Sequence, residues 1–326
     1  MNPIWNQSRP PLGDHSEKKD RLTAFFNASA EAVKLQALTL PASLLGGHEV
    51  LLARDDRLHP MIAGNKWWKL KHVLIESAAR GVHTIKSFGG AYSNHLLALA
   101  GAGYLFGFRT IGVLRGQEPR ALNPVLRQAS AWGMEFEPVS RIRYRELTQG
   151  EHAIKEPAMD DGCLILPEGG AGPLALKGIK EMVGRIQAPY QLLCTPVGTG
   201  TTLTGMILGA ASDSSVMGFS ALKGAQFIEK KVGDLLAEAQ SPHARWQMAH
   251  AYHFGGYARR SQELDAFCSH LSCQLGNSID WVYTGKMLYG LNDLMLKQAL
   301  PEGRTVVAWM TGNACQPGGS LAVGDY

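Results

Sequence analysis

Residues 63–70 read Ala-Gly-Asn-Lys-Trp-Trp-Lys-Leu, which places Lys66 at the start of a predicted helix, directly after a glycine and an asparagine. Apolar residues recur at helical spacing up to about residue 80, and Gly81 supplies a stop. The amino end of a helix carries a partial positive charge, which penalises an ammonium group and favours a neutral amine. Lys66 is therefore a candidate reactive amine, although many lysines at helix starts simply extend into solvent.

Segments typical of strands alternate with segments typical of helices on both sides of this lysine. Strands are predicted at residues 49–54, 84–88, 110–115, 162–167, 191–197, 215–219 and 304–310. Helices are predicted at residues 65–80, 93–106, 124–133, 174–186, 201–211, 224–239 and 286–300. Such alternation indicates largely parallel sheets covered by helices on both faces. Two runs of this kind, on either side of Gly170, predict two α/β units with a cleft between them.

The composition fits a large folded protein. Its 326 residues are 45% hydrophobic and 18% charged, and a net charge of +4 without a basic cluster makes nucleic acid an unexpected partner. No run is long enough to span a membrane and the amino end lacks the apolar core of a signal peptide, so we expect a cytoplasmic protein with no membrane partner.

Cysteines and histidines add little chemistry. The cysteines lack CxxC spacing, which favours buried thiols in a reducing compartment, and they are Cys163, Cys194, Cys268, Cys273 and Cys315. The histidines lack metal-ligand spacing, so no metal site is expected. His95 is the one histidine expected near a site, as a surface or lining residue.

Four turns rich in small residues lie where α/β proteins bind ligands, beyond the carboxyl ends of strands. Residues 198–202, Gly-Thr-Gly-Thr-Thr, fit a phosphate cradle or an ordinary strand-to-helix turn about equally well. They match neither a Walker loop nor a dinucleotide fingerprint. The turns at residues 89–94, 167–170 and 311–313 have plain alternatives, which for Ser93 is a helix cap. Together with Lys66, the four turns meet the needs of one cofactor, pyridoxal 5′-phosphate.

From about residue 35 onward the chain resembles the pyridoxal-phosphate enzymes built like the tryptophan synthase β subunit. Within them it is most similar to the D-cysteine desulfhydrase and 1-aminocyclopropane-1-carboxylate deaminase family. The motifs that carry the resemblance are Arg54-Asp55-Asp56, Gly64-Asn65-Lys66 with Lys69-Leu70, Gly89-Gly90 with Ser93-Asn94, Pro167-Glu168-Gly169-Gly170, Gly198-Thr199-Gly200-Thr201-Thr202, Tyr283-Thr284-Gly285-Lys286 and Thr311-Gly312.

The resemblance implies an α/β fold with two domains, each a largely parallel twisted sheet flanked by helices, and the cofactor in the cleft. Residues 1–66 and 172–326 would form a large cofactor-binding domain, and residues 67–171 a smaller α/β domain. A small amino-acid substrate and a homodimer are also implied.

The resemblance further implies the roles of individual residues. The implied catalytic residues are Lys66, Ser93 and Tyr283, and the implied cofactor-binding residues are Lys66, Lys69, Asn94, Gly198, Thr199, Gly200, Thr201, Thr202 and Thr311. Lys66 would bind the cofactor covalently, Lys69 and the 198–202 turn would bind its phosphate, Asn94 its ring hydroxyl and Thr311 its pyridine nitrogen. A hydroxyl leaves that nitrogen largely unprotonated, which suits elimination better than transamination.

The expected reaction is the α,β-elimination of a D-cysteine desulfhydrase, which yields a keto acid, ammonia and sulfide. Thr284 matches the D-cysteine enzymes resembled, whereas the cyclopropane deaminases carry glutamate there. Phe254 stands where the family has a second active-site tyrosine, unless Tyr257 replaces it, and Trp67-Trp68 replaces smaller or basic residues. The alternatives are 1-aminocyclopropane-1-carboxylate deamination, another elimination or β-replacement on the same cofactor, and a non-catalytic nucleotide-binding α/β protein.

Overall fold

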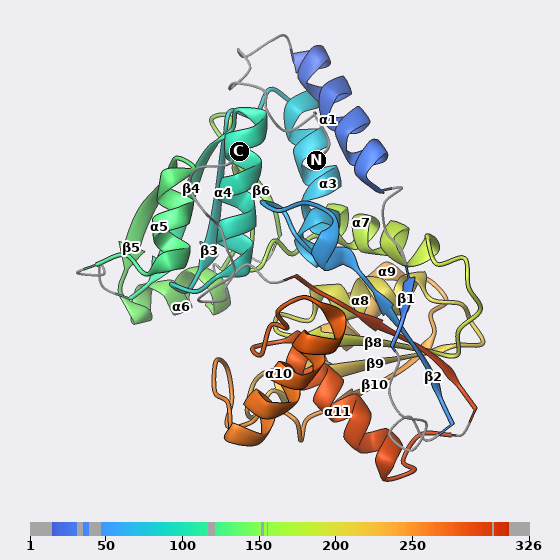
Figure 1. The fold of residues 1–326 in the computed structure, drawn as a ribbon. Coiled ribbons are helices and arrows are strands. Elements are labelled where there is room, and N and C mark those ends of the chain that lie inside the picture. Colours follow the sequence, from blue (N-terminus) through green and yellow to red (C-terminus); the bar gives the residue numbers. More distant parts are fainter. Residues whose placement is uncertain are drawn as a thin grey trace.

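The computed structural model describes residues 15–30, 35–38, 47–116, 121–150, 153–154, 156–301 and 303–312. Figure 1 shows two sheets, each with helices packed on it, joined by helices that run between them. The predicted α/β architecture with two largely parallel sheets is confirmed. Residue Asn313 of the last predicted turn and Cys315 lie outside the described residues.

The larger sheet has the strand order β1-β2-β11-β8-β9-β10. Its strands are β1 (Leu35–Ala37), β2 (Glu49–Ala53), β8 (Leu192–Val197), β9 (Ser215–Ser220), β10 (Arg245–Ala249) and β11 (Thr305–Trp309). Only β1 is antiparallel to its neighbour. Val307 of β11 pairs with Leu51 on one side and Leu193 on the other, so the early strand β2 belongs to the sheet of the carboxyl-terminal half.

The smaller sheet has the order β5-β4-β3-β7-β6. Its strands are β3 (Thr84–Gly89), β4 (Arg109–Arg115), β5 (Met134–Val139), β6 (Ala158–Asp160) and β7 (Cys163–Ile165). Edge strand β6 is antiparallel and the others are parallel. The four edge strands β1, β5, β6 and β10 were not predicted, because they lack the continuous apolar runs of the central strands.

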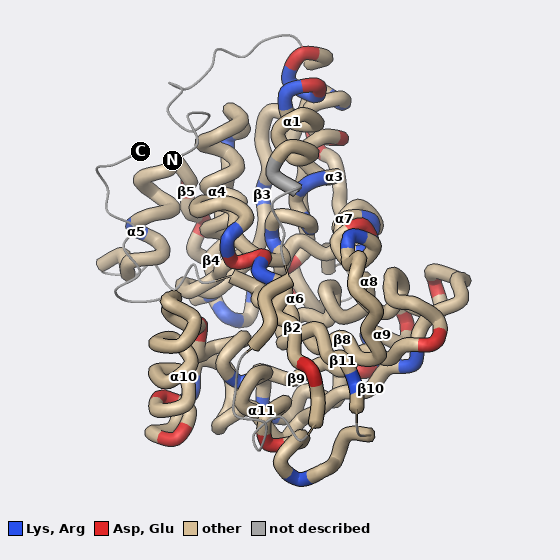
Figure 2. Tube along the Cα trace, turned by 45° about the vertical axis from the view of Figure 1, so that its right-hand side comes forward, with Lys and Arg blue, Asp and Glu red and all other residues tan. Residues whose placement is uncertain are grey.

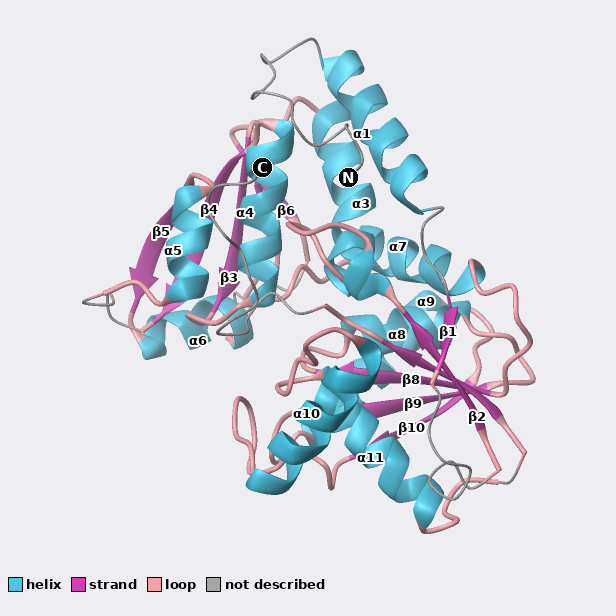
Figure 3. Ribbon diagram, in the orientation of Figure 1, coloured by secondary structure: helices cyan, strands magenta, loops and turns pink. Residues whose placement is uncertain are grey.

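Helices cover the sheets as the alternation predicts (Figure 3). They are α1 (His15–Ala30), α3 (Asn65–Ala79), α4 (Asn94–Phe106), α5 (Pro124–Ala131), α6 (Arg141–Gln149), α7 (Pro173–Gly184), α8 (Thr201–Gly209), α9 (Gln226–Ala239), α10 (Gln262–Leu275) and α11 (Thr284–Leu296), with a 3₁₀ turn at Asp55–Arg57. On the larger sheet, α10 and α11 pack on one face and α8 and α9 on the other. Within the described residues, no helix is long and apolar enough to cross a membrane.

Three helices, α1, α6 and α10, are absent from the predicted set. The signal for α10 was present, because its buried residues Leu264, Cys268, Leu271 and Leu275 recur at helical spacing. In contrast, α6 buries only Tyr144, so its apolar pattern is too sparse to identify a helix. The predicted cap at Ser93 is confirmed, and Asn123 caps α5 in the same way, because each side chain accepts a bond from a backbone N–H of the first turn.

Helix α3, which carries Lys66, packs mainly against α7 and α1. A boundary at residue 66 would cut this helix in its first turn, and the division of the chain into residues 1–66 with 172–326 and residues 67–171 remains our proposal. The indole side chains of Trp67 and Trp68 on helix α3 are fully buried. The helix is thus anchored along its length, which fixes the direction of its amino end.

Charged and sulfur-containing side chains are spread through the fold. Figure 2 shows lysine and arginine interspersed with aspartate and glutamate along the helices, so neither sign dominates this view.

Cys194 and Cys268 are buried as expected, but Cys163 is half-buried and Cys273 is exposed. The expectation of uniformly buried thiols is therefore wrong for Cys273, which lies on the outer face of α10.

Candidate active site

Lys66 lies in the first turn of α3, against the segment that follows β11. The preceding Gly64 has a φ of 65°, and a Cβ there would lie 1.9 Å from the carbonyl oxygen of Thr311. Only glycine allows both this conformation and this approach. The predicted cofactor lysine and the predicted partner of the pyridine nitrogen are consequently neighbours through their backbones.

Asn65 connects this lysine to the predicted phosphate cradle. The Nζ of Lys66 donates to Oδ1 of Asn65 at 2.7 Å, and Nδ2 of Asn65 donates to Oγ1 of Thr202 at 2.8 Å. Asn65 and Thr202 are both buried. The amino ends of α3 and α8 therefore meet, although 137 positions separate the two bonded residues. Asn65 had no predicted role, and its only signal in the sequence was its place in the Gly-Asn-Lys motif.

The turn between β8 and α8 has the form of an anion site. Gly200, with a φ of 87°, precedes the first residue of α8, and no side chain caps that helix. The hydroxyls of Thr199 and Thr201 lie 3.5 Å apart at the same end. An uncapped helix start presents backbone N–H groups and the positive end of the helix dipole to any ligand placed there. The five residues 198–202 therefore fit a phosphate group.

Lys69 adds an amino group beside this turn. It is buried, and its Nζ donates to the carbonyl oxygen of Gly169 at 2.9 Å. A Cβ on Gly169 would lie 2.9 Å from the side chain of Thr199, so the 167–170 turn adjoins the cradle. Burial lowers the pKa of the Lys69 ammonium well below its usual value, and repulsion from Lys66 and Lys231 lowers it further. A bound phosphate dianion would offset that repulsion.

The turn at residues 89–94 presents Ser93 and Asn94 at the amino end of α4. Ser93 is the N-cap, and its Oγ accepts from the backbone N–H of Leu96 at 3.2 Å. A hydroxyl that accepts one bond can still donate another, so capping is compatible with a role in proton transfer. Asn94 is the first residue of the helix and is half-buried.

His95 is buried, which corrects the expectation of a surface or lining residue. Its Nε2 lies 2.9 Å from Oγ of Ser87, and its ring packs against the backbone of Gly170. Burial lowers the pKa of His95 well below its usual value, with Lys69 and Lys66 adding to the effect. The ring is therefore neutral at pH 7 and holds α4 against the 167–170 turn, a long-range contact that its sequence position did not indicate.

Tyr283 faces the cradle from the amino end of α11. Its ring carbon Cε1 and its hydroxyl would each lie 3.2 Å from a Cβ on Gly198. The ring centroid of Tyr257 is 5.9 Å from that of Tyr283, and the hydroxyl of Tyr257 donates to the backbone oxygen of Tyr92 at 3.4 Å. Because Tyr92 belongs to the 89–94 turn, this bond joins opposite sides of the site.

The structure resolves which aromatic residue stands beside Tyr283. Phe254 packs against Tyr289 at a centroid distance of 5.0 Å, so Tyr257 provides the second phenol near the site. Buried Lys286 holds this loop by donating to the carbonyl oxygens of His253 and Gly256 at 2.9 and 2.8 Å. The sequence motif contained Lys286, but only the fold shows what it holds.

Thr284 and Thr311 complete the site, with their hydroxyl oxygens 3.3 Å apart. Thr284 is buried at the start of α11, and Thr311 follows β11. The two threonines belong to one connected set of residues. Its other members are Lys66, Asn65, the residues 198–202 and Tyr283. It offers an amine, an anion site and a hydroxyl pair, which are the groups that pyridoxal phosphate requires. The chemistry and the open helix start therefore fit that cofactor.

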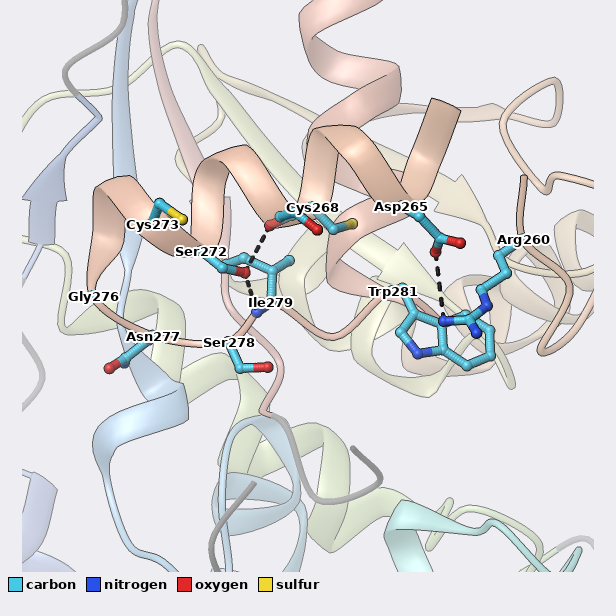
Figure 4. A pocket seen from close by; sticks show the side chains of 11 residues that line it. Arg260, Asp265, Cys268, Ser272, Cys273, Gly276, Asn277, Ser278, Ile279 and Trp281 are labelled. Atoms are coloured by element: carbon cyan, nitrogen blue, oxygen red, sulfur yellow. Dashed lines mark hydrogen bonds and ion pairs between the residues drawn. The ribbon is translucent and has the colours of Figure 1, made fainter. Parts of the chain in front are cut away.

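A separate groove of about 720 Å³ lies along α10 and the loop that follows it. Figure 4 shows its lining, which includes the ion pair of Arg260 with Asp265 and the bond from Ser272 to the carbonyl oxygen of Cys268. None of its lining residues is a predicted site residue. The groove is therefore distinct from the set around Lys66.

The chain is similar to several known proteins. A family model described as pyridoxal-phosphate dependent enzyme matches residues 31–312. A putative 1-aminocyclopropane-1-carboxylate deaminase of Pyrococcus abyssi is 28% identical over 78% of this chain and 82% of its own. A mitochondrial bifunctional D-cysteine desulfhydrase/1-aminocyclopropane-1-carboxylate deaminase of Arabidopsis thaliana is 25% identical over 95% of this chain and 81% of its own. The solved structure of an ACC deaminase homologue has a TM-score of 0.71 and 24% identity, over 88% of this chain and 94% of that one.

Proposed function

Because the chain belongs to the pyridoxal-phosphate dependent enzyme family, we propose that it removes ammonia from a small amino acid by α,β-elimination, as a D-cysteine desulfhydrase does. The predicted family and cofactor are confirmed. The products of D-cysteine would be a keto acid, ammonia and sulfide. The observation that supports this reaction is the pair of hydroxyls of Thr284 and Thr311, 3.3 Å apart.

The hydroxyl pair sets the electronic character of the site. When bound, pyridoxal phosphate withdraws electrons from the α-carbon of the amino acid joined to it. A carboxylate at the pyridine nitrogen would stabilise a proton there and strengthen that withdrawal, whereas a neutral hydroxyl does not. Thr311 would therefore moderate electron withdrawal, which suits loss of a good β-leaving group such as sulfide. Thr284, buried beside it, supplies a neutral neighbour where a glutamate would add charge.

The remaining residues bind, orient and move protons. Lys66 would bind the cofactor, and its amine, once released by the substrate, would take the α-proton. Asn65 holds that amine through its 2.7 Å bond. Ser93 and Tyr283 would hold the substrate and exchange protons with it.

The cofactor itself would be held at several points. Lys69 and residues 198–202 would bind the phosphate, and Asn94 would bind the ring hydroxyl. The bond between Tyr257 and Tyr92 spans the site and would restrict the entry of water.

Deamination of 1-aminocyclopropane-1-carboxylate is the second candidate. It is favoured by the names of the relatives, since several are called deaminases of that amino acid. The same lysine, cradle and phenols would serve it. The neutral Thr284 is the feature that favours elimination over it.

We also propose a homodimer and a cytoplasmic location. The dimer follows from the resemblance, and the location follows from the lack of CxxC spacing among the cysteines. Light scattering on the purified protein would test the dimer, and a monomer mass would reject it.

An amino-acid screen tests the proposed reaction. Purified protein with pyridoxal phosphate is assayed for keto acid and sulfide from D-cysteine, L-cysteine, D-serine, O-acetylserine and 1-aminocyclopropane-1-carboxylate. We expect the highest kcat/KM with D-cysteine and equal yields of sulfide and keto acid. Turnover of the cyclopropane acid alone would establish the second candidate, and no release of keto acid from any of the five amino acids would reject both. Thr284→Glu should lower D-cysteine turnover more than Thr284→Ser, because only the glutamate adds charge.

A further inference from the structure

Asp55 is a buried carboxyl group that bridges two indole side chains. It is fully buried, and its Oδ2 accepts from Nε1 of Trp68 at 2.8 Å and from Nε1 of Trp309 at 2.5 Å. Both indoles are themselves buried. Within the described part of the chain, the other oxygen, Oδ1, has no hydrogen-bond partner.

Among the described residues no cation forms a salt bridge with Asp55, although Arg185 acts on it electrostatically, whereas the carboxylate next to it has such a bridge. Asp56 receives two bonds from Arg54, at 2.9 and 2.7 Å. Burial raises the pKa of Asp55 to about 7, against the effect of its two indole bonds. A buried carboxyl without an ion pair costs stability, so its presence is not explained by folding alone.

The two indoles come from the two segments that carry Lys66 and Thr311, the residues predicted to contact opposite ends of the cofactor ring. Trp68 lies two residues after Lys66 on α3, and Trp309 ends β11, two residues before Thr311. The backbone oxygen of Asp55 also accepts from the N–H of Gly64 at 2.9 Å. Asp55 therefore contacts residues on both sides of Lys66, and it also contacts the strand that leads to Thr311.

We propose that Asp55 is a positioning residue that sets the separation between Lys66 and Thr311. This inference rests on the proposed function, in which Lys66 and Thr311 contact opposite ends of the pyridine ring. The ring is rigid, so the distance between its two contacts must be held closely. The Trp67-Trp68 pair, which departs from the family resembled, then has a role, because Trp68 supplies the N–H that a smaller side chain at that position would lack.

Three substitutions test the bridge. Asp55→Leu replaces both carboxylate oxygens with methyl groups and so accepts from neither indole. Trp68→Phe and Trp309→Phe each keep an aromatic ring but remove one N–H donor. Asp56→Asn is the matched control, because it neutralises the adjacent carboxylate, which bonds to Arg54 and not to either indole.

The measurements are the dissociation constant of pyridoxal phosphate from the apo-protein, the visible absorption spectrum of the bound cofactor, and kcat with KM. We expect Asp55→Leu, Trp68→Phe and Trp309→Phe each to lower kcat by on the order of tenfold to a hundredfold and to shift the absorption band, because misplacement by about 1 Å has effects of that size. Asp56→Asn should leave the band and kcat unchanged.

A purely structural role would lower the melting temperature while leaving the absorption band and kcat of the folded variants as in the wild type, and that result would overturn the inference. If Asp55→Leu does not fold, Trp309→Phe carries the same test. The proposed function is checked separately with Lys66→Ala, which should abolish the wild-type band. If the absorption band requires Lys66 but none of the three bridge substitutions changes the band or kcat, the proposed role of Asp55 is rejected and the proposed function is not. A wild-type protein that cannot bind the cofactor rejects both.

Discussion

The side-chain amide of Asn65 donates to the hydroxyl of Thr202 at 2.8 Å, and this bond joins the helix that carries Lys66 to the helix that begins at the phosphate cradle. The same amide accepts from the Nζ of Lys66 at 2.7 Å. Asn65 thus fixes the position of the lysine amine relative to the anion site. The cofactor would contact Lys66 and the 198–202 turn at the same time.

Asn65→Ala should weaken cofactor binding by about tenfold, because a buried hydroxyl and an amine both lose a partner. The dissociation constant of pyridoxal phosphate, measured by absorbance titration of the apo-protein, is the appropriate quantity. Asn65→Asp separates the two bonds, since it keeps an acceptor for Lys66 but cannot donate to Thr202. An unchanged dissociation constant in both variants would show that the two hydrogen bonds of Asn65 do not contribute to cofactor binding.

Ser93→Ala should retain the cofactor but lose most turnover, because the hydroxyl that exchanges protons with the substrate is gone. It should also cost about 1 kcal/mol of stability, because Ser93 caps α4. Ser261→Ala is a matched control, since Ser261 caps α10 with the same 3.2 Å bond and is not a predicted site residue. Equal stability losses with unequal turnover would separate the two roles. If Ser93→Ala turns over as fast as the wild type, Ser93 is only a helix cap.

Lys69→Met should reduce the preference for pyridoxal phosphate over pyridoxal, because the predicted role of Lys69 is to neutralise the phosphate. The ratio of the two dissociation constants is measured by fluorescence titration of the apo-protein. Lys71→Met is the control, since Lys71 is also buried on α3 but pairs with Glu181. A ratio that falls equally in both variants would mean that helix stability, and not phosphate binding, was altered.

Asp55 should make stability depend on pH. Its pKa of about 7 in the folded protein lies above the ordinary value of about 4, so the folded state binds the proton more tightly than the unfolded chain. The stabilisation is fully present below about pH 4 and is lost as the pH rises through about 7. Asp56 and Arg185 also act on this carboxyl, in opposite directions.

Urea unfolding across this range gives the difference in unfolding free energy between the wild type and Asp55→Asn. The difference should fall with rising pH by up to about 4 kcal/mol. Asp56→Asn should show no comparable slope relative to the wild type. Parallel curves for the wild type and Asp55→Asn would place the folded pKa of Asp55 near its ordinary value.

Much of the site could be read from the sequence because its parts are short local motifs. The Gly-Asn-Lys start of α3, the 198–202 turn and the Ser93 cap each depend on a few adjacent residues. The three-dimensional relations among them could not be read in this way. The contact of Tyr257 with Tyr283 and the burial of His95 depend on loops that different elements bring together.

The sequence by itself determined the alternation of strands and helices, the helix starts and the residue types offered to a cofactor, because these depend on local periodicity and turn chemistry. The tertiary structure decided that β2 pairs with β11, that Tyr257 and not Phe254 faces Tyr283, and that Asp55 lies between Trp68 and Trp309. Those contacts join residues far apart in the chain. They form because burial of apolar surface packs the elements together, and no local pattern encodes the partners that this packing selects.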